Sequence, residues 1–121
     1  MYSAQLLDHF QNPRNVGDLE DGPGSVRVEM SNPACGDILR LAARFEDGIV
    51  QAVRFKVRGC TASIAAGSVL TELMTGARRE RLAAIRASDI EAALGGLEPA
   101  SKHAAVLCVD ALRSLLAANN L

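Results

Sequence analysis

The chain has 121 residues, of which 49% are hydrophobic, and a formal net charge of -1. This length suits one folding unit with a hydrophobic core, so we expect residues 1–121 to form a single domain. There is no long basic run, and no apolar stretch approaches the roughly 20 residues that span a bilayer. These features argue against nucleic-acid and membrane partners, and they favour a cytoplasmic location.

The first element predicted is a short helix that begins after Ser3, a residue type that commonly caps helices. Helical spacing places Leu6, Leu7 and Phe10 on one face. The helix should end before Pro13, because proline cannot continue it. The Gly-, Asp- and Pro-containing stretch from there to residue 24 predicts a loop.

Three strands are predicted next, from apolar residues that alternate with polar ones over 26–30, 38–45 and 53–58. Glu46-Asp47-Gly48 separates the second and third runs and is typical of a hairpin turn. Three successive antiparallel strands with one polar face are the simplest arrangement for this pattern.

After the third strand the apolar period changes from two to about 3.6, and the change falls at Gly59-Cys60. Helices are predicted over 62–75, 80–85, 88–94 and 101–118. In the third of these, Ser88 and Glu91 have the spacing of a capping box. The pattern therefore predicts an α+β fold in which helices, the last one long, pack against a three-stranded sheet.

Candidate metal ligands stand where these elements meet. The turn at Asn32–Asp37 places the Cys35 thiol and the Asp37 carboxylate two residues apart between two strands. Cys60 lies at the start of a helix, where free backbone N–H groups favour the thiolate, and His103 lies in the first turn of the last helix. Two thiolates, a carboxylate and an imidazole form a plausible four-ligand set for a metal ion.

The residues also have simpler interpretations. The number of cysteines, three, favours metal binding or thiol chemistry over a disulfide framework, yet the separations between Cys35, Cys60 and His103 match no zinc-finger spacing. A turn with an incidental thiol at Cys35 and an ordinary helix-end residue at His103 are the alternatives. His9 is interpreted as a packing or surface residue.

Several sequence motifs in order resemble the NifU/IscU-type iron-sulfur cluster assembly scaffolds. The motifs are Met1-Tyr2-Ser3 and residues 8–17 (DHFQNPRNVG), 32–37 (NPACGD), 59–63 (GCTAS) and 70–72 (LTE). The resemblance runs nearly the full length of the chain. It implies the same α+β architecture, namely a three-stranded antiparallel sheet packed by helices.

The resemblance also implies a function and a set of ligands. A labile 2Fe-2S cluster or iron, or zinc in its place, would be held by Cys35, Cys60 and nearby groups, with His103 among them and Asp37 helping the cluster to leave. Such a protein is a scaffold or carrier, not an enzyme. It receives sulfur from a cysteine desulfurase and passes the cluster to recipient apo iron-sulfur proteins.

The sequence departs from the family pattern at its last motif, where Ala104 follows His103 in place of the third cysteine. The loop over 97–101 also differs from the segment that the family's Hsp70-type chaperone binds. Cys108 lies one helical turn after Ala104 and is a candidate replacement ligand, although a small buried residue is the simpler interpretation.

Three functions therefore remain open at this stage. The first is a cluster scaffold that uses Cys35, Cys60 and His103, with Asp37 or Cys108 as the fourth ligand. The second is a zinc-dependent sulfur acceptor, in which the Cys35 thiolate takes a persulfide from a desulfurase and Zn²⁺ is held by Cys35, Asp37, Cys60 and His103. The third is a diverged relative that binds partners but no cluster.

Overall fold

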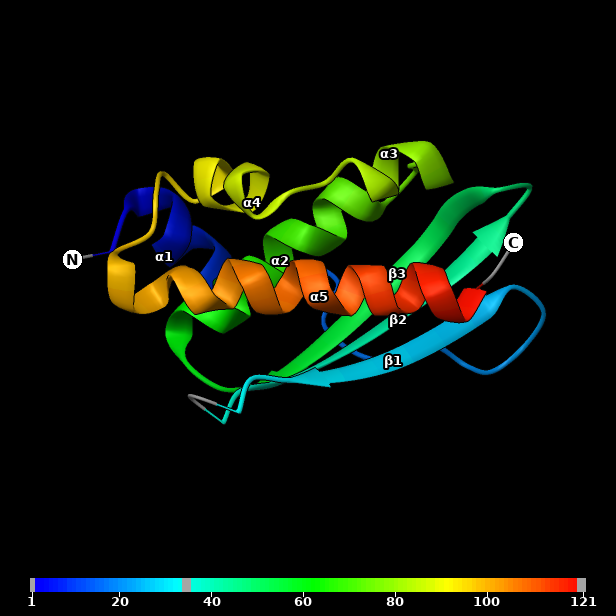
Figure 1. Ribbon diagram of the computed structural model, residues 1–121, viewed down its shortest axis with the longest axis horizontal. Helices are drawn as coiled ribbons and strands as arrows, with labels where there is room; N and C mark the ends of the chain where they lie inside the picture. Colours follow the sequence, from blue (N-terminus) through cyan, green and yellow to red (C-terminus); the bar gives the residue numbers. More distant parts are fainter. Residues whose placement is uncertain (1, 34–35, 120–121) are drawn as a thin grey trace.

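A computed structural model describes residues 2–33 and 36–119. The three predicted strands form one antiparallel sheet in the order β1-β2-β3, with β1 at Ser25–Ser31, β2 at Ile38–Glu46 and β3 at Ile49–Arg58 (Figure 1). The predicted α+β class and strand order are confirmed. Alternation places one row of each strand toward the helices and the other away from them. In the second row Ala42 is still buried, at 5% exposure, and it lines a small cavity with Leu19 and Asp21 of the loop after α1.

The β2–β3 hairpin explains why burial along β3 is not strictly alternating. Asp47 and Gly48 both have positive φ, at 54° and 76°, which is the geometry of a tight hairpin turn. The register between β2 and β3 then shifts at Arg44/Phe45. Because of this irregularity, Val50 and Val53 are both buried, at 1% and 0% exposure, although they are three residues apart.

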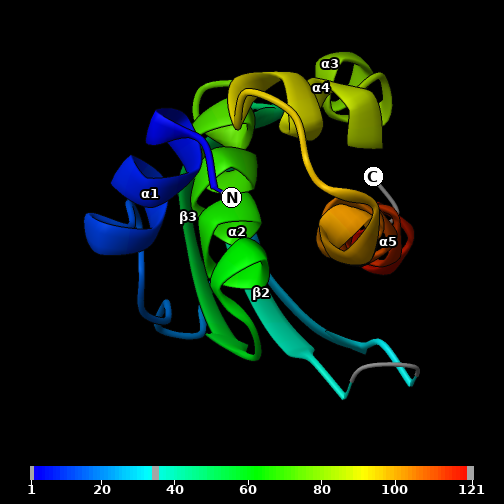
Figure 2. The same cartoon turned by 90° about the vertical axis from the view of Figure 1, so that its left-hand side faces the viewer.

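The helices lie on one side of the sheet, and within residues 2–33 and 36–119 no helix covers the other side (Figures 1 and 2). The elements are α1 (Ala4–Gln11), α2 (Thr61–Met74), α3 (Arg79–Ala83), α4 (Ala87–Ala93), a 3₁₀ turn η1 (Pro99–Ser101) and α5 (Lys102–Asn119). Helix α2 packs on β3, and α5 packs across β1 and β2. The hydrophobic core fills the space between these two helices and the sheet.

Helix α2 is buried around most of its circumference, which a one-sided amphipathic pattern does not predict. Its buried residues include Ala66, Gly67, Ser68 and Val69, four in succession. Small residues allow this, because a helix with short side chains can approach its neighbours closely. At Gly67 a side chain would meet the Phe55 ring, since a Cβ there would lie 2.6 Å from two of its carbons.

The apolar face predicted for α1 is only partly buried. Ser3 caps the helix as expected, accepting a hydrogen bond from the Leu6 amide, and Leu6 is buried at 2% exposure. Leu7 and Phe10, however, are 38% and 37% exposed. Helix α1 contacts mainly α2. Helix α2 therefore covers only a narrow stripe of α1, and the residues on either side of this stripe remain at the surface.

The predicted capping box of α4 was also wrong, by two residues. The helix begins after Arg86, and the Asp89 carboxylate accepts the Arg86 amide at 2.8 Å. Ser88 therefore lies inside the first turn. Glu91 lies three residues after Ser88, and Asp89 lies three residues after Arg86. The sequence alone therefore allows the helix to begin at either position.

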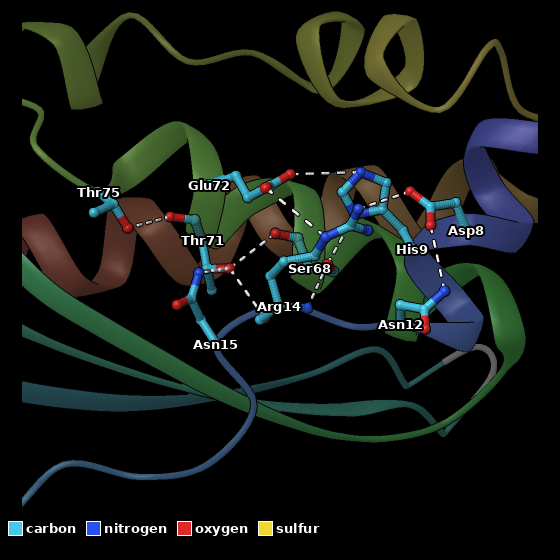
Figure 3. A network of polar contacts seen from close by, with 9 residues as sticks. All are labelled: Asp8, His9, Asn12, Arg14, Asn15, Ser68, Thr71, Glu72 and Thr75. Atoms are coloured by element: carbon cyan, nitrogen blue, oxygen red, sulfur yellow. Dashed lines mark hydrogen bonds and ion pairs between the residues drawn. The ribbon is translucent and has the colours of Figure 1, made fainter.

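A polar network joins α1 and the loop after it to α2 (Figure 3). The Ser68 hydroxyl lies 2.8 Å from His9 Nδ1 and accepts the Arg14 amide at 2.9 Å. His9 Nε2 lies 3.5 Å from Glu72, and Arg14 forms an ion pair with Asp8 at 2.7 Å. Residues of the 8–17 motif thus anchor the N-terminal segment to α2.

The same segment continues alongside β3. The Gly17 amide donates to the Phe55 carbonyl at 2.9 Å, and the Phe55 amide donates to the Asn15 carbonyl at 3.0 Å. The Asn15 side chain donates to Thr71 Oγ1 at 3.0 Å. The loop after α1 is therefore fixed at several points. Within residues 2–33 and 36–119, no helix combines the length and apolar character that a membrane span needs.

Candidate metal centre

Three element ends converge at one end of the molecule and carry the candidate ligands. Asp37 immediately precedes β2, Cys60 immediately precedes α2, and His103 is the second residue of α5. The starts of β2, α2 and α5 lie together in both views (Figures 1 and 2). Residues far apart in sequence are therefore adjacent in space.

The donor atoms of these three residues lie within 4.8 Å of one another. Cys60 Sγ is 3.3 Å from Asp37 Oδ2 and 3.7 Å from His103 Nε2. His103 Nε2 is 3.5 Å from Asp37 Oδ2. One sulfur, one oxygen and one nitrogen thus form a small triangle.

The size of this triangle fits a tetrahedral metal ion. Zinc binds imidazole nitrogen, carboxylate oxygen and thiolate sulfur at about 2.0–2.3 Å, which separates neighbouring ligand atoms in a tetrahedron by roughly 3.3–3.6 Å. The three observed separations of 3.3, 3.5 and 3.7 Å are close to this spacing. The donors need little rearrangement to hold one ion, and thiolate and imidazole suit zinc and iron alike.

Asp37 is the buried member of the group, at 5% exposure. Burial by itself raises the pKa of this carboxyl, but hydrogen bonds from Ser63 and Cys60 outweigh it, so the pKa lies below its ordinary value. The carboxylate packs directly on Gly59, where a Cβ would lie 2.5 Å from Asp37 Cγ. The glycine at 59 leaves the space that Asp37 occupies.

Ser63 belongs to this site, although the sequence had indicated it only as a candidate cap of the helix and not as a partner of Asp37. It is buried, its hydroxyl donates to Asp37 Oδ2, and it lies 3.3 Å from Cys60 Sγ. The signal was its position three residues after Cys60, which places both side chains on one face of the first turn of α2. Cys60 makes no capping hydrogen bond with its own side chain.

Two other cysteine predictions have different outcomes. Cys35 lies outside the described residues, so its place in the ligand set stays a prediction. Cys108 is described and is 1% exposed within the hydrophobic core, where burial raises the pKa of its thiol to about 12. It does not belong to the group formed by Asp37, Cys60 and His103. Ala104, the residue after His103, is also fully buried.

A second polar arrangement, Ser68–His9–Glu72, has the order of a hydrolytic triad but not its accessibility. The Ser68 hydroxyl is bonded to both the Arg14 amide and His9, and the residue is 0% exposed. A nucleophile must reach its substrate, and this hydroxyl cannot. The arrangement is therefore interpreted as part of the anchor of α1.

Comparison with known proteins identifies relatives over nearly the whole chain. A family model described as the NifU-like N terminal domain matches residues 1–119. The chain is 41% identical over 113 residues to the iron-sulfur cluster assembly scaffold protein IscU 1 of Archaeoglobus fulgidus. This match covers 93% of this chain and 72% of that protein. The chain is 37% identical over 118 residues to the IscU scaffold protein of Escherichia coli, covering 96% and 91%.

A solved structure supports the fold. The N-terminal NifU-like protein of Brucella abortus superposes with a TM-score of 0.76 at 20% identity, and the match covers 98% of this chain and 93% of that one. At this identity the similarity concerns the architecture alone. The family resemblance noted from the sequence motifs is confirmed by the family model and by the relatives above.

Proposed function

Because the chain belongs to the NifU-like N terminal domain family, we propose that it is a scaffold on which an iron-sulfur cluster is assembled and from which the cluster is passed on. The observation that carries this proposal is the triangle of Cys60, Asp37 and His103 donors at tetrahedral spacing. Relatives at 37–41% identity are named as scaffold proteins for this process. The cargo is iron, or a 2Fe-2S cluster.

We propose Cys35, Asp37, Cys60 and His103 as the residues that hold the cargo. Thiolates bind iron and bridge well to a sulfur-rich cluster, whereas a carboxylate and an imidazole bind iron less firmly than further thiolates would. The mixed set therefore suits a cluster that must leave again. The partners would be a cysteine desulfurase that supplies sulfur and recipient apo iron-sulfur proteins.

Other features of the proposal concern the whole protein. Residues 1–121 would act as one scaffold unit, in the cytoplasm, and as a carrier without catalysis of its own. A chaperone of the Hsp70 type is a weaker candidate partner, because the 97–101 segment differs from the one that the family's chaperone binds. In this chain the segment leads into the η1 turn at Pro99–Ser101.

A second function, a zinc-dependent sulfur acceptor, is favoured by one observation. Ala104 removes one thiolate from the family's set but leaves a complete Cys₂AspHis set for zinc. In this function the Cys35 thiolate attacks the outer sulfur of the desulfurase persulfide. A new S–S bond forms on Cys35, and the desulfurase cysteine leaves as a thiolate.

Metal and acid-labile sulfide analysis of protein purified without oxygen distinguishes the two functions. The scaffold is expected to contain iron and an equal amount of sulfide and to absorb visible light. Zinc without iron or sulfide would instead support the acceptor. Protein that contains neither, and that cannot be loaded with either, would contradict both.

Ala104→Cys tests whether the missing thiol limits cluster binding. If the scaffold function holds, the variant is expected to retain more cluster after reconstitution than the natural chain, because a thiolate would be added beside His103. Unchanged occupancy would show that position 104 is not limiting.

A further inference from the structure

The outward face of the sheet is strongly basic, although the chain as a whole has a net charge of -1. Strand alternation and register place six cations on it, one on β1, two on β2 and three on β3. They are Arg27, Arg40, Arg44, Arg54, Lys56 and Arg58, and we call them the basic face. The acidic outward positions of these strands are Glu29, opposite Arg40, and Glu46, at the end of β2. The helices all lie on the other side of the sheet (Figures 1 and 2).

The cations of the basic face differ in how they are neutralised. Arg27 pairs with Asp18 at 3.0 Å and with Asp21 at 2.9 Å. Arg40 pairs with Glu29 at 2.9 Å. These two are internally balanced, so they contribute little net field.

The remaining cations form no ion pair of this kind, although the charge of Lys56 contributes to lowering the pKa of Asp18. Arg44, Lys56 and Arg58 form no ion pair with residues 2–33 or 36–119, and Arg54 bonds only neutral oxygens, those of Val53 and Asn15. Lys56 and Arg58 are also exposed. Unpaired cations gathered on one surface create a positive field that attracts an anionic partner.

The exposed cations line a hollow next to the candidate metal centre. A depression of about 360 Å³ is bounded by Glu29, Ile38, Arg40, Lys56, Val57 and Arg58. Ile38 directly follows Asp37, and Arg58 is two residues before Cys60. A molecule bound in this depression would therefore lie beside the site where cargo is held.

The chemistry of the surface favours an acidic protein segment over nucleic acid. Single-stranded nucleic acids bind sheet surfaces through aromatic side chains on which bases stack. The basic face has none, because Phe45 and Phe55 point into the core and Tyr2 and Phe10 belong to the N-terminal segment. Lys56 and Arg58 are two residues apart on one strand, which places them roughly 7 Å from each other along it. Side chains at alternate positions of an extended partner chain have the same spacing.

We propose that the basic face is a docking surface for an extended, acidic segment of a partner protein, which it holds beside Cys60. The docking requires charge and shape but no metal, so it can be tested on the metal-free protein. Failure of the scaffold function and failure of this docking are therefore separate results.

The probe is a peptide of alternating Glu and Ser, titrated into isotope-labelled, metal-free protein and followed by NMR. Amide shifts are expected around residues 38–40 and 56–58. In the Lys56→Glu/Arg58→Glu variant the affinity should fall about tenfold, because each reversal removes one attraction and adds a repulsion. The matched control, Arg78→Glu/Arg113→Glu, changes the net charge equally at exposed positions that do not line the depression, and it should bind nearly as the natural chain does.

Several outcomes would overturn the proposal. These are absence of peptide binding, an equal loss of affinity in the control variant, and tighter binding of a single-stranded oligonucleotide of the same net charge. If the charge-reversed variant does not fold, Lys56→Gln/Arg58→Gln gives the same test with a smaller expected loss. Shift changes centred on α3 or α5 in the natural chain would contradict it as well.

Discussion

Ser63 orients the Asp37 carboxylate at the candidate metal centre. The carboxylate accepts hydrogen bonds from the Ser63 hydroxyl and from the Cys60 thiol at the start of α2. The same oxygen faces Cys60 and His103. Hydrogen bonds that orient a ligand typically affect metal affinity even though they do not touch the metal.

We predict that Ser63→Ala weakens zinc binding by about tenfold or more, because Asp37 loses the donor that orients it. The measurement is competition for Zn²⁺ against a chromophoric chelator. Ser68→Ala is the control, since Ser68 is a buried serine of the same helix that bonds His9 instead. Equal zinc affinity in the Ser63 variant and the natural chain would contradict a positioning role.

Cys108→Ala is expected to leave the bound metal unchanged. Cys108 is a core residue whose pKa is raised to about 12 by burial, so it remains a neutral thiol at physiological pH. Removing the sulfur should lower the free energy of unfolding by about 1 kcal/mol, through lost packing. Metal analysis checks the first statement and denaturant unfolding checks the second, with Cys60→Ala as the variant that should lose metal. Loss of metal in the Cys108 variant would restore it as a candidate ligand.

At the scale of elements, the sequence predicted which residues of the strands are buried better than which residues of the helices are buried. The alternation of Val53, Phe55 and their neighbours reflects a sheet with one covered face, which is a local property. The burial of α2 depends instead on elements distant in sequence that surround it, and the exposure of Phe10 reflects how little of α1 they cover. Amphipathic patterns cannot specify how many neighbours a helix has.

The close packing of α2 on β3 predicts the effect of Gly67→Ala. Alanine would favour the helix by about 1 kcal/mol, but its Cβ would overlap the Phe55 ring, and overpacking costs about 1–3 kcal/mol. We expect a net loss of stability in denaturant unfolding. Phe55→Leu in the same chain should relieve part of it, so the two losses should not add. A more stable Gly67→Ala variant would show that the ring moves aside freely.

The anchor between α1 and α2 predicts a dependence of stability on pH. Burial, followed by the charge of Arg14, lowers the pKa of His9 below its ordinary value despite Glu72 and Asp8 nearby. The unfolded chain, with a His pKa of about 6.5, then binds the proton first as pH falls. Neutral His9 therefore stabilises the fold at pH values above the pKa of the unfolded state. This stabilisation is lost as pH falls through the unfolded-state pKa toward the lower pKa of the folded state.

Thermal unfolding at pH about 7.5 and about 5.5, on either side of the usual His pKa, measures this effect. The natural chain is expected to lose more stability between the two values than His9→Gln, in which the titrating ring is absent. An identical loss in both proteins would mean that other groups carry the pH dependence.

At the scale of the whole molecule, the candidate site exists only when the chain is folded. Cys60 and His103 are 43 positions apart, and their donors come within 3.7 Å because β3, α2 and α5 pack on one core. The residue types and their places at element ends were predictable from the sequence. Their spacing in three dimensions was not, since it depends on packing between distant elements.

Convergence of this kind predicts that metal stabilises the fold. An ion that binds only the folded chain adds about 2.7 kcal/mol when its free concentration is about 100 times its dissociation constant. Thermal unfolding with and without Zn²⁺ should therefore show a higher midpoint with metal, reversed by a chelator. The shift should disappear in Cys60→Ala and persist in Cys108→Ala. An unchanged midpoint despite bound zinc would place the ion elsewhere.

The segment 15–17 that runs beside Phe55 closes the middle of one sheet edge, because it occupies both backbone groups of that residue. Exposed edge strands act as templates on which further chains add and aggregate. Within the described residues, β1 is thus the edge left open, and its outward side chains include Arg27 and Glu29. We therefore expect fibril-like growth, under conditions that promote it, to begin at β1.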